Sequence, residues 1–241
     1  MKGSSFIKFL FLSVCLIELT ARFFNWPEVN LFTKPLLMPL LLIYFTKSLS
    51  SSPNTSFLLA CWALVFSCIG DVVLLFQDRD SIFFLIGLSA FAIAQLLYVV
   101  SFLKARHSNE VPTSNIHKIS YSTPFVLLGA ALLWKVYPPA GALGIPVLIY
   151  ALLLLTMVIS AMLRKGQTNQ ASFNQLFFGA ALFMLSDSLI AWNKFLTPQE
   201  YSGLFIMATY VLAQWNIANG LLKHYNKTWV FQRYQGPGSL N

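Results

Sequence analysis

The sequence has very few charged residues, which limits the kinds of protein it can form. Charged residues make up 10% of its 241 positions, hydrophobic residues make up 57%, and the mean hydropathy is +0.67. A soluble domain carries roughly 25% charged residues, so this chain cannot cover a folded core with a water-exposed surface. Apolar runs of about 18 to 24 residues recur, each long enough to cross a bilayer core of ~30 Å. We therefore predict one all-α integral membrane domain of about eight transmembrane helices over residues 1–230, followed by a flexible tail over 231–241.

The positions of the charges explain the formal net charge of +8 without a nucleic-acid partner. If the N-terminus is inside, eleven of the sixteen lysines and arginines fall inside and five outside, the bias that orients membrane helices. This predicts cytoplasmic N- and C-termini, and the compact loops favour a bacterial inner membrane. The first apolar run contains Glu18 and lacks a small-x-small cleavage motif, so we interpret it as a retained helix. The expected spans are residues 6–24, 31–47, 56–76, 80–104, 119–137, 142–163, 172–192 and 200–222.

The sequence also lacks the clusters that metal and nucleophile chemistry require. The three cysteines lie in apolar spans, where their number and spacing predict neither a disulfide framework nor a metal site. No His-Glu-x-x-His motif is present. The histidines fall on the inside face, which argues against a Ser-His-Asp triad, and we expect no cofactor and no metal. These residues are Cys15, Cys61, Cys68, His107, His117 and His224.

Two aspartates, Asp71 and Asp187, lie within apolar spans. A carboxylate in hydrocarbon costs ~2.5–3.5 kcal/mol on insertion scales, so such residues usually face the bundle interior and have a function. Each lies about five residues before the outer end of a span, on helices that run in the same direction, so both carboxyls are expected at one depth. Their small neighbours Gly70 and Ser186 permit close helix approach. Two facing carboxyls in a low-dielectric cleft predict one protonated and one ionised group, an acid and a base together. The alternative is a carboxylate that snorkels or pairs with a lysine.

Other polar residues accompany the aspartates. Glu18 falls close to the same depth, and Lys34, at the outer start of the second span, is expected just above it. Tyr44 and Tyr150 are interpreted as packing residues or interface anchors. A further group lies deep in the fourth and eighth spans, where interhelical hydrogen bonds are the alternative to a functional role. This group is Gln95, Tyr98, Gln214, Asn216 and Asn219.

Short segments four helices apart resemble each other. Pro39 to Tyr44 in the second span is similar to Pro146 to Tyr150 in the sixth. The Gly-Asp pair at 70–71 corresponds to Ser-Asp at 186–187, and Ala-Gln at 94–95 corresponds to Ala-Gln at 213–214. An even offset predicts two parallel four-helix repeats related by an axis along the membrane normal. Chance similarity among apolar segments is the alternative.

At these positions the chain resembles the lysoplasmalogenase family of small membrane enzymes, the YhhN-like proteins. The resemblance covers nearly the whole chain in order, and one departure is Gln95, where the family often has histidine. The matching segments are residues 34–35, 70–74, 91–98, 183–191, 193–195 and 210–214.

The resemblance implies a lysophospholipid substrate within membrane lipids. The implied reaction is hydrolysis of the vinyl ether bond of lysoplasmenyl-ethanolamine or -choline to a fatty aldehyde and a glycerophospho-base. It implies catalysis by Asp71 and Asp187, with the phosphate head group at the outer rim near Lys34 or Lys194. The residues expected to contact substrate are Glu18, Lys34, Gln95, Tyr98, Asn193, Lys194 and Gln214.

Two other functions fit part of the pattern. Buried carboxylates on repeated helices also occur in ion-coupled transporters and lipid-binding membrane proteins, although no paired Gly/Pro interruptions flank these aspartates. An intramembrane aspartyl protease usually has Gly-x-Gly-Asp, whereas the first glycine is replaced here by Cys68. Hydrolysis of a lipid vinyl ether remains the favoured prediction.

Overall fold

The computed structural model describes residues 2–106 and 115–234, and the side chains of residues 3–106 and 120–226. These residues form eight α-helices and one short 3-10 helix, which confirms the all-α prediction. His107 and the side chain of His117 lie outside the described residues. The elements are α1 (Lys2–Phe23), α2 (Pro27–Lys47), α3 (Thr55–Leu74), α4 (Ser81–Lys104), α5 (Asn115–Ala140), η1 (Gly141–Leu143), α6 (Gly144–Met162), α7 (Gln170–Phe195) and α8 (Ser202–Tyr234).

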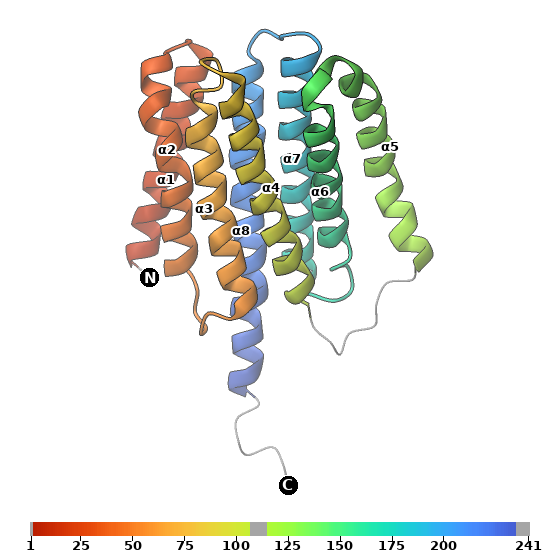
Figure 1. Ribbon diagram of the computed structural model, residues 1–241. Helices are drawn as coiled ribbons and strands as arrows, with labels where there is room; N and C mark the ends of the chain where they lie inside the picture. The colour runs from red at the N-terminus through yellow and green to blue at the C-terminus, as the bar shows by residue number, and fades with distance from the viewer. Residues whose placement is uncertain (1, 107–114, 235–241) are drawn as a thin grey trace.

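The helices run alternately up and down through one bundle (Figure 1). Helices α1, α3, α5 and α7 end at the upper end of the bundle as drawn, and α2, α4, α6 and α8 begin there. Within the described residues, six segments are long and apolar enough to cross a membrane, and one of them, Ser120–Met162, contains most of α5 and all of α6. The expected bounds agree with the helices to within a few residues, except that α8 continues past residue 222 to Tyr234.

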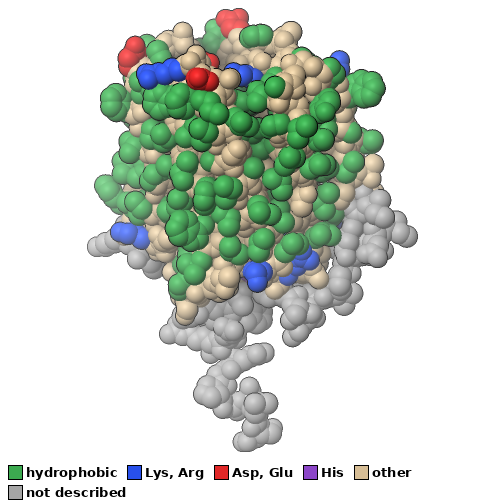
Figure 2. All heavy atoms as spheres, viewed as in Figure 1, with side chains coloured by type: hydrophobic (Ala, Val, Ile, Leu, Met, Phe, Trp, Pro, Cys, Tyr) green, Lys and Arg blue, Asp and Glu red, His purple; other side chains and the backbone are tan. Residues whose placement is uncertain are grey.

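The surface has the character of a bilayer-embedded protein. Hydrophobic side chains cover the middle of the face shown in Figure 2, and charged side chains gather at its two ends. The upper end carries both signs of charge, whereas only lysine and arginine are visible at the lower end of this face. The chain is therefore an integral membrane protein, because an apolar belt of this kind is stable against lipid rather than water.

Glycines allow two helix pairs to pack closely. A Cβ atom at Gly179 of α7 would lie 2.8 Å from the carbonyl oxygen of Ala213 in α8, and one at Gly220 of α8 would lie 2.7 Å from the amide nitrogen of Leu176 in α7. In the other half, a Cβ at Gly70 of α3 would lie 2.6 Å from the Phe91 ring of α4. Helix pairs α3–α4 and α7–α8 have the most extensive packing.

Arg164 anchors the lower end of the bundle between α6 and α7. Its side chain is fully buried and donates from Nε to the carbonyl oxygen of Ala105 (3.0 Å) and from Nη2 to the Ser172 hydroxyl (3.1 Å). Burial lowers the pKa of this guanidinium to about 10. His224 lies in the same region, with Nδ1 2.8 Å from the Thr168 hydroxyl. It therefore belongs to this lower-end network rather than to the aspartates in the upper half.

Candidate active site

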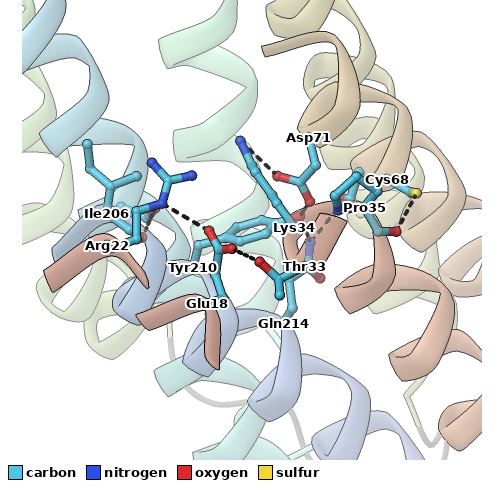
Figure 3. Close-up of polar contacts among 12 residues, drawn as sticks. Glu18, Arg22, Thr33, Lys34, Pro35, Cys68, Asp71, Ile206, Tyr210 and Gln214 are labelled. Atoms are coloured by element: carbon cyan, nitrogen blue, oxygen red, sulfur yellow. Dashed lines mark hydrogen bonds and ion pairs between the residues drawn. The ribbon is translucent and has the colours of Figure 1, made fainter. Parts of the chain in front are cut away.

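Asp71 lies one turn before the end of α3, in a buried cluster (Figure 3). Its Oδ2 accepts a hydrogen bond from the Tyr210 hydroxyl of α8 at 2.7 Å, and its Oδ1 lies 3.6 Å from Nζ of Lys34. Lys34 therefore forms an ion pair with the aspartate, and the same side chain lines the cavity at the upper end of the bundle that is described below. Helix α2 begins at Pro27, earlier than expected, so Lys34 is two turns inside it and its long side chain reaches the carboxylate.

Asp187 has a separate set of partners. Its Oδ2 accepts hydrogen bonds from the Tyr150 hydroxyl of α6 at 2.5 Å and from Nε2 of Gln95 in α4 at 3.2 Å. Tyr150 packs against the core, as the sequence suggested, and its hydroxyl in addition bonds Asp187, which the sequence did not predict. Tyr44, in the similar segment of α2, instead bonds Oδ1 of Asn219 at 2.8 Å. Each aspartate thus has its own phenol, supplied by a different helix.

The Phe91 side chain lies next to the surroundings of both aspartates. The ring of Phe91 packs edge-on against Tyr210, with centroids 5.9 Å apart, and also lines a cleft that contains Asp187. Gly70 is needed beside Asp71 because any side chain there would strike this ring. Ser186, beside Asp187, instead bonds the carbonyl oxygen of Ile206 on α8 at 2.9 Å. The small neighbours therefore serve the α3–α4 and α7–α8 contacts.

Gln214 connects Tyr210 to residues of α3 and α4 through hydrogen bonds. Its Nε2 donates to the Ser67 hydroxyl at 3.0 Å and lies 3.5 Å from the Tyr210 oxygen, and its Oε1 accepts from Tyr98 at 2.6 Å. Gln214 and Tyr98 are fully or almost fully buried and line none of the three cavities described below. They connect α3, α4 and α8 through the interhelical hydrogen bonds that the sequence offered as the alternative to substrate contact.

Glu18 and Asn216, two further polar residues considered in the sequence, form hydrogen bonds with other residues of the protein. Glu18 is fully buried, pairs with Nε of Arg22 at 2.9 Å and accepts from the Thr33 hydroxyl (Figure 3). Asn216 donates to the carbonyl oxygen of Leu212 in its own helix, at 2.7 Å. Glu18 therefore orients Arg22 and does not itself line the cavity above it.

The upper end of the bundle contains a polar cavity of about 330 Å³. Three cationic side chains, those of Arg22, Lys34 and Lys194, and one anionic side chain, Asp78, contribute to its wall. Asn193 lines it too, as its predicted role requires. The other lining residues are Leu74, Gln77, Ile190, Ser202, Gly203, Ile206 and Met207. Arg22 and Asp78 were not identified from the sequence, because nothing in their own segments distinguishes them from other surface charges.

Two narrow apolar clefts meet at Asp187. The first, called here the α4 cleft, has a volume of about 40 Å³ and is lined by Leu74, Phe84, Leu88, Phe91, Val147, Tyr150, Asp187, Ile190, Ala191 and Phe195. The second, the α5 cleft, has a volume of about 60 Å³ and is lined by Gly129, Leu132, Leu133, Val136, Val147, Tyr150, Ala151, Leu154, Met184, Asp187, Ser188 and Ala191. Tyr150 and Asp187 line both clefts, so this hydrogen-bonded pair stands at their junction.

The α4 cleft shares lining residues with both the polar cavity and the α5 cleft, and Asp187 lines both clefts. Leu74 and Ile190 line both the polar cavity and the α4 cleft, and each lies three residues after one of the aspartates. Asp71 and Asp187 therefore lie at similar depth, one helical turn below this boundary. Among the described residues there is no group of three or more His, Cys, Asp or Glu side chains that could hold a metal ion. Asp187 therefore lies between a polar and an apolar compartment.

Comparison with known proteins adds the family. A sequence model of the YhhN family matches residues 29–221, a region that contains both aspartates, Lys34 and Lys194. The chain belongs to the YhhN family. The likeness therefore covers every residue of the carboxylate centres and most of the polar cavity, while Arg22 precedes the matched region.

Curated relatives carry the name lysoplasmalogenase. The chain is 35% identical over 152 residues to lysoplasmalogenase TMEM86B of Sus scrofa, covering 63% of this chain and 58% of the relative. It is 32% identical over 161 residues to lysoplasmalogenase TMEM86A of Homo sapiens, covering 64% of this chain and 61% of that protein. Over 191 residues it is 26% identical to TMEM86B of Mus musculus. The matched region spans less than two thirds of the first two relatives. No solved structure matches the chain.

Proposed function

We propose that this YhhN-family protein hydrolyses the vinyl ether bond of lysoplasmalogens, that is, of lysoplasmenyl-ethanolamine or -choline. The products would be a fatty aldehyde and a glycerophospho-base. The name of the curated relatives supports this reaction. The observation that carries it in the structure is the position of Asp187, at the junction of two apolar clefts, one of which shares Leu74 and Ile190 with the wall of a cationic cavity. A single-chain lipid with a charged head group and a reactive bond between head and tail fits that order of compartments.

The polar cavity is the proposed site of the head group. Lys34, Lys194 and Arg22 would meet the phosphate, and Asp78 on the same wall would meet the ammonium group of ethanolamine or choline. On α7, Asn193 lies six residues after Asp187, which is ~9 Å along a helix axis. This separation is comparable with the length of the glycerol unit that joins the phosphate to the vinyl ether.

The proposed acid is Asp187. Among the described residues no lysine or arginine pairs with it, whereas Asp71 is paired with Lys34. The neutral acid is therefore the form of Asp187 that suits its apolar surroundings, and the carboxylate is the form of Asp71 that suits Lys34. Asp187 transfers its proton to the alkene carbon that is not bonded to the ether oxygen. The other alkene carbon becomes an oxocarbenium ion, which the two carboxylates stabilise electrostatically.

Water completes the reaction. A water molecule adds to the oxocarbenium carbon as Asp187 takes back a proton, giving a hemiacetal. The hemiacetal hydroxyl then gives up its proton as the carbon–oxygen bond to the glycerol breaks, the glycerol oxygen takes up a proton, and the aldehyde is released. Tyr150 and Gln95 hold the Asp187 carboxyl in place, and Tyr210 holds Asp71.

The test is aldehyde release by the purified protein. We expect cleavage of lysoplasmenyl-ethanolamine but not of its saturated-ether or ester analogue. Asp187→Asn and Asp71→Asn should each lower turnover by roughly 10²- to 10⁴-fold, the usual contribution of general acid–base groups. Asp80→Asn is the matched control, because Asp80 caps α4 at the same end, where its carboxylate accepts from the amide of Ile82, and asparagine caps equally well.

Near-normal turnover by either site variant would refute the two-carboxylate mechanism. Uptake of intact lipid into proteoliposomes, without aldehyde, would favour a transporter instead.

We also propose that the lower end of the bundle faces the cytoplasm. Eleven of the sixteen basic residues belong to segments assigned to that side. The polar cavity would then face the opposite side, in a bacterial inner membrane as the compact loops suggest. Protease cleavage of a C-terminal tag in inverted vesicles but not in intact cells would support this orientation, and the reverse pattern would refute it.

A further inference from the structure

Small side chains create the α5 cleft at the edge of the bundle. Helix α5 is the outermost helix on its side (Figure 1) and packs against α6 and α7. The cleft lies between these three helices, and a third of its lining residues have small side chains. These are Gly129 of α5, Ala151 of α6, and Ser188 and Ala191 of α7.

The side chains that line this cleft are apolar except for those of Tyr150, Asp187 and Ser188. Ser188 donates its hydroxyl to the carbonyl oxygen of Met184 in its own helix at 2.7 Å, so it offers no unbonded proton to the cleft. The Tyr150 hydroxyl is bonded to Asp187. The Asp187 carboxyl is therefore the one acidic group that faces an otherwise apolar wall, and a hydrocarbon chain with its reactive atoms beside Asp187 matches that wall.

The α5 cleft reaches deeper along α6 and α7 than the α4 cleft does. Both clefts include Val147 and Ala191, which lie about one turn above Tyr150 and Asp187. The α5 cleft in addition includes Leu154 and Met184, which lie about one turn below them, closer to the middle of these helices. Because lipid tails point to the middle of the bilayer, the α5 cleft has the direction that a tail requires.

We propose that the α5 cleft binds the alkenyl chain of the substrate and that Gly129 determines whether the chain fits. The inference rests on the proposed function and extends it to a tail site. The first carbons beyond the vinyl ether lie between Gly129, Ala151 and Ser188, and the rest of the chain continues between α5 and α7 into the bilayer. The fatty aldehyde leaves by the same side of the bundle.

Gly129 is a position where added bulk would enter the α5 cleft. A Cβ atom there would lie 3.3 Å from Cε of Met184, so even a methyl group would touch the opposite wall. A phenyl ring would fill the cleft. The preceding residue, Leu128, is 67% exposed and does not line the cleft. Leu128→Phe therefore changes the size of a neighbouring side chain on the same helix without entering the cleft.

The kinetic experiment compares Gly129→Phe with Leu128→Phe on two substrates. One is lysoplasmenyl-ethanolamine with a long alkenyl chain, and the other is glycerophosphoethanolamine carrying only an ethenyl ether, which has the reactive bond but no tail. We expect Gly129→Phe to lower kcat/KM for the long-chain substrate by at least about tenfold and to leave cleavage of the ethenyl ether within about twofold. Leu128→Phe should leave both values unchanged. Equal losses on both substrates, or no loss on the long chain, would overturn the tail site.

Photolabelling of the wild-type protein tests the position of the lipid tail independently of the kinetics. A saturated lysoether lipid with a diazirine close to the ether oxygen is photolysed in micelles, and the labelled peptides are mapped. Labelling of Leu132 or Leu133 on α5 supports the tail site, whereas labelling confined to Phe84 and Leu88 places the tail in the α4 cleft and refutes it. The label reports binding without turnover. Failure of the wild-type protein to release aldehyde from either vinyl ether would refute the proposed function, while the label would still locate the chain.

Discussion

The ammonium nitrogen of Lys34 lies 3.6 Å from Oδ1 of Asp71, and the same side chain forms part of the polar cavity wall. One residue therefore joins the solvent-accessible cationic compartment to a carboxylate that is only 2% exposed. A phosphate bound in the cavity would compete with Asp71 for the charge of Lys34. This arrangement links head-group binding to the electrostatic state of the candidate active site.

Replacing Lys34 by methionine tests that link. Removal of one partner leaves a buried carboxylate without its counter-charge, which typically costs several kcal/mol, so we expect a melting temperature in detergent lowered by roughly 5 to 10 °C. Aldehyde release should fall as well, because both the phosphate site and Asp71 lose a cation. Circular dichroism melting and an aldehyde assay measure the two effects.

The double variant Lys34→Met with Asp71→Asn separates stability from chemistry. Because the buried charge is removed together with its partner, the melting temperature should recover by more than half, while turnover should stay lost. A double variant as unstable as Lys34→Met alone would show that the lysine stabilises the bundle by packing rather than by charge.

Removing the hydroxyl of Tyr150 tests the support of the proposed acid. Tyr150→Phe deletes a 2.5 Å hydrogen bond to Asp187 and should lower kcat roughly tenfold to a hundredfold, the range expected for a hydrogen bond to a charged or reacting group. Tyr44→Phe is the matched control, since Tyr44 ends the similar sequence segment in α2 and bonds Asn219 instead. Equal kcat values for the two variants would contradict the assignment.

The sequence alone is enough to locate the aspartates and the helices. Asp71 and Asp187 stand out because a carboxylate in an apolar run is costly, and span length follows directly from bilayer thickness. Their equal depth also follows from the sequence, since it depends only on helix direction and residue count. The structure agrees, because Leu74 and Ile190, one turn above them, share one wall.

The partners of the aspartates depend on helix rotation, which hydropathy does not report. Tyr44 and Tyr150 occupy similar segments, yet only Tyr150 faces an aspartate, because α6 and α2 present different faces to their neighbours. The ion pair between Lys34 and Asp71 was not predicted, because the start of α2 was placed four residues too late. The α5 cleft depends on what is missing at Gly129, and a glycine in an apolar run gives no sign of whether it faces lipid or a cleft.

Lys194 tests the head-group site without disturbing the carboxylates. It lies on the cavity wall with Nζ 5.2 Å from the centroid of the Phe84 ring. Lys194→Ala should raise KM for lysoplasmenyl-ethanolamine about threefold and leave kcat unchanged, because an exposed cation contributes modestly to phosphate binding. Arg79→Ala is the control: Arg79 also lies over a phenylalanine ring at the same end but does not line the cavity. A KM change of the same size in both variants would indicate a general effect of surface charge on lipid binding.

Valine at Gly179 tests the close contact between α7 and α8, the helices that carry Asp187 and Tyr210. A Cβ at this position would lie 2.8 Å from backbone atoms of Ala213 and Ile217, which cannot move aside as a flexible side chain would. The helices must separate, so we expect a loss of about 3 kcal/mol of stability and a parallel loss of aldehyde release. Gly3→Val is the control, because nothing lies within 4 Å of a Cβ at Gly3, and its melting temperature should stay within about 2 °C of wild type. If Gly179→Val melts like Gly3→Val, the close approach of these backbones is not what holds the two aspartate centres together.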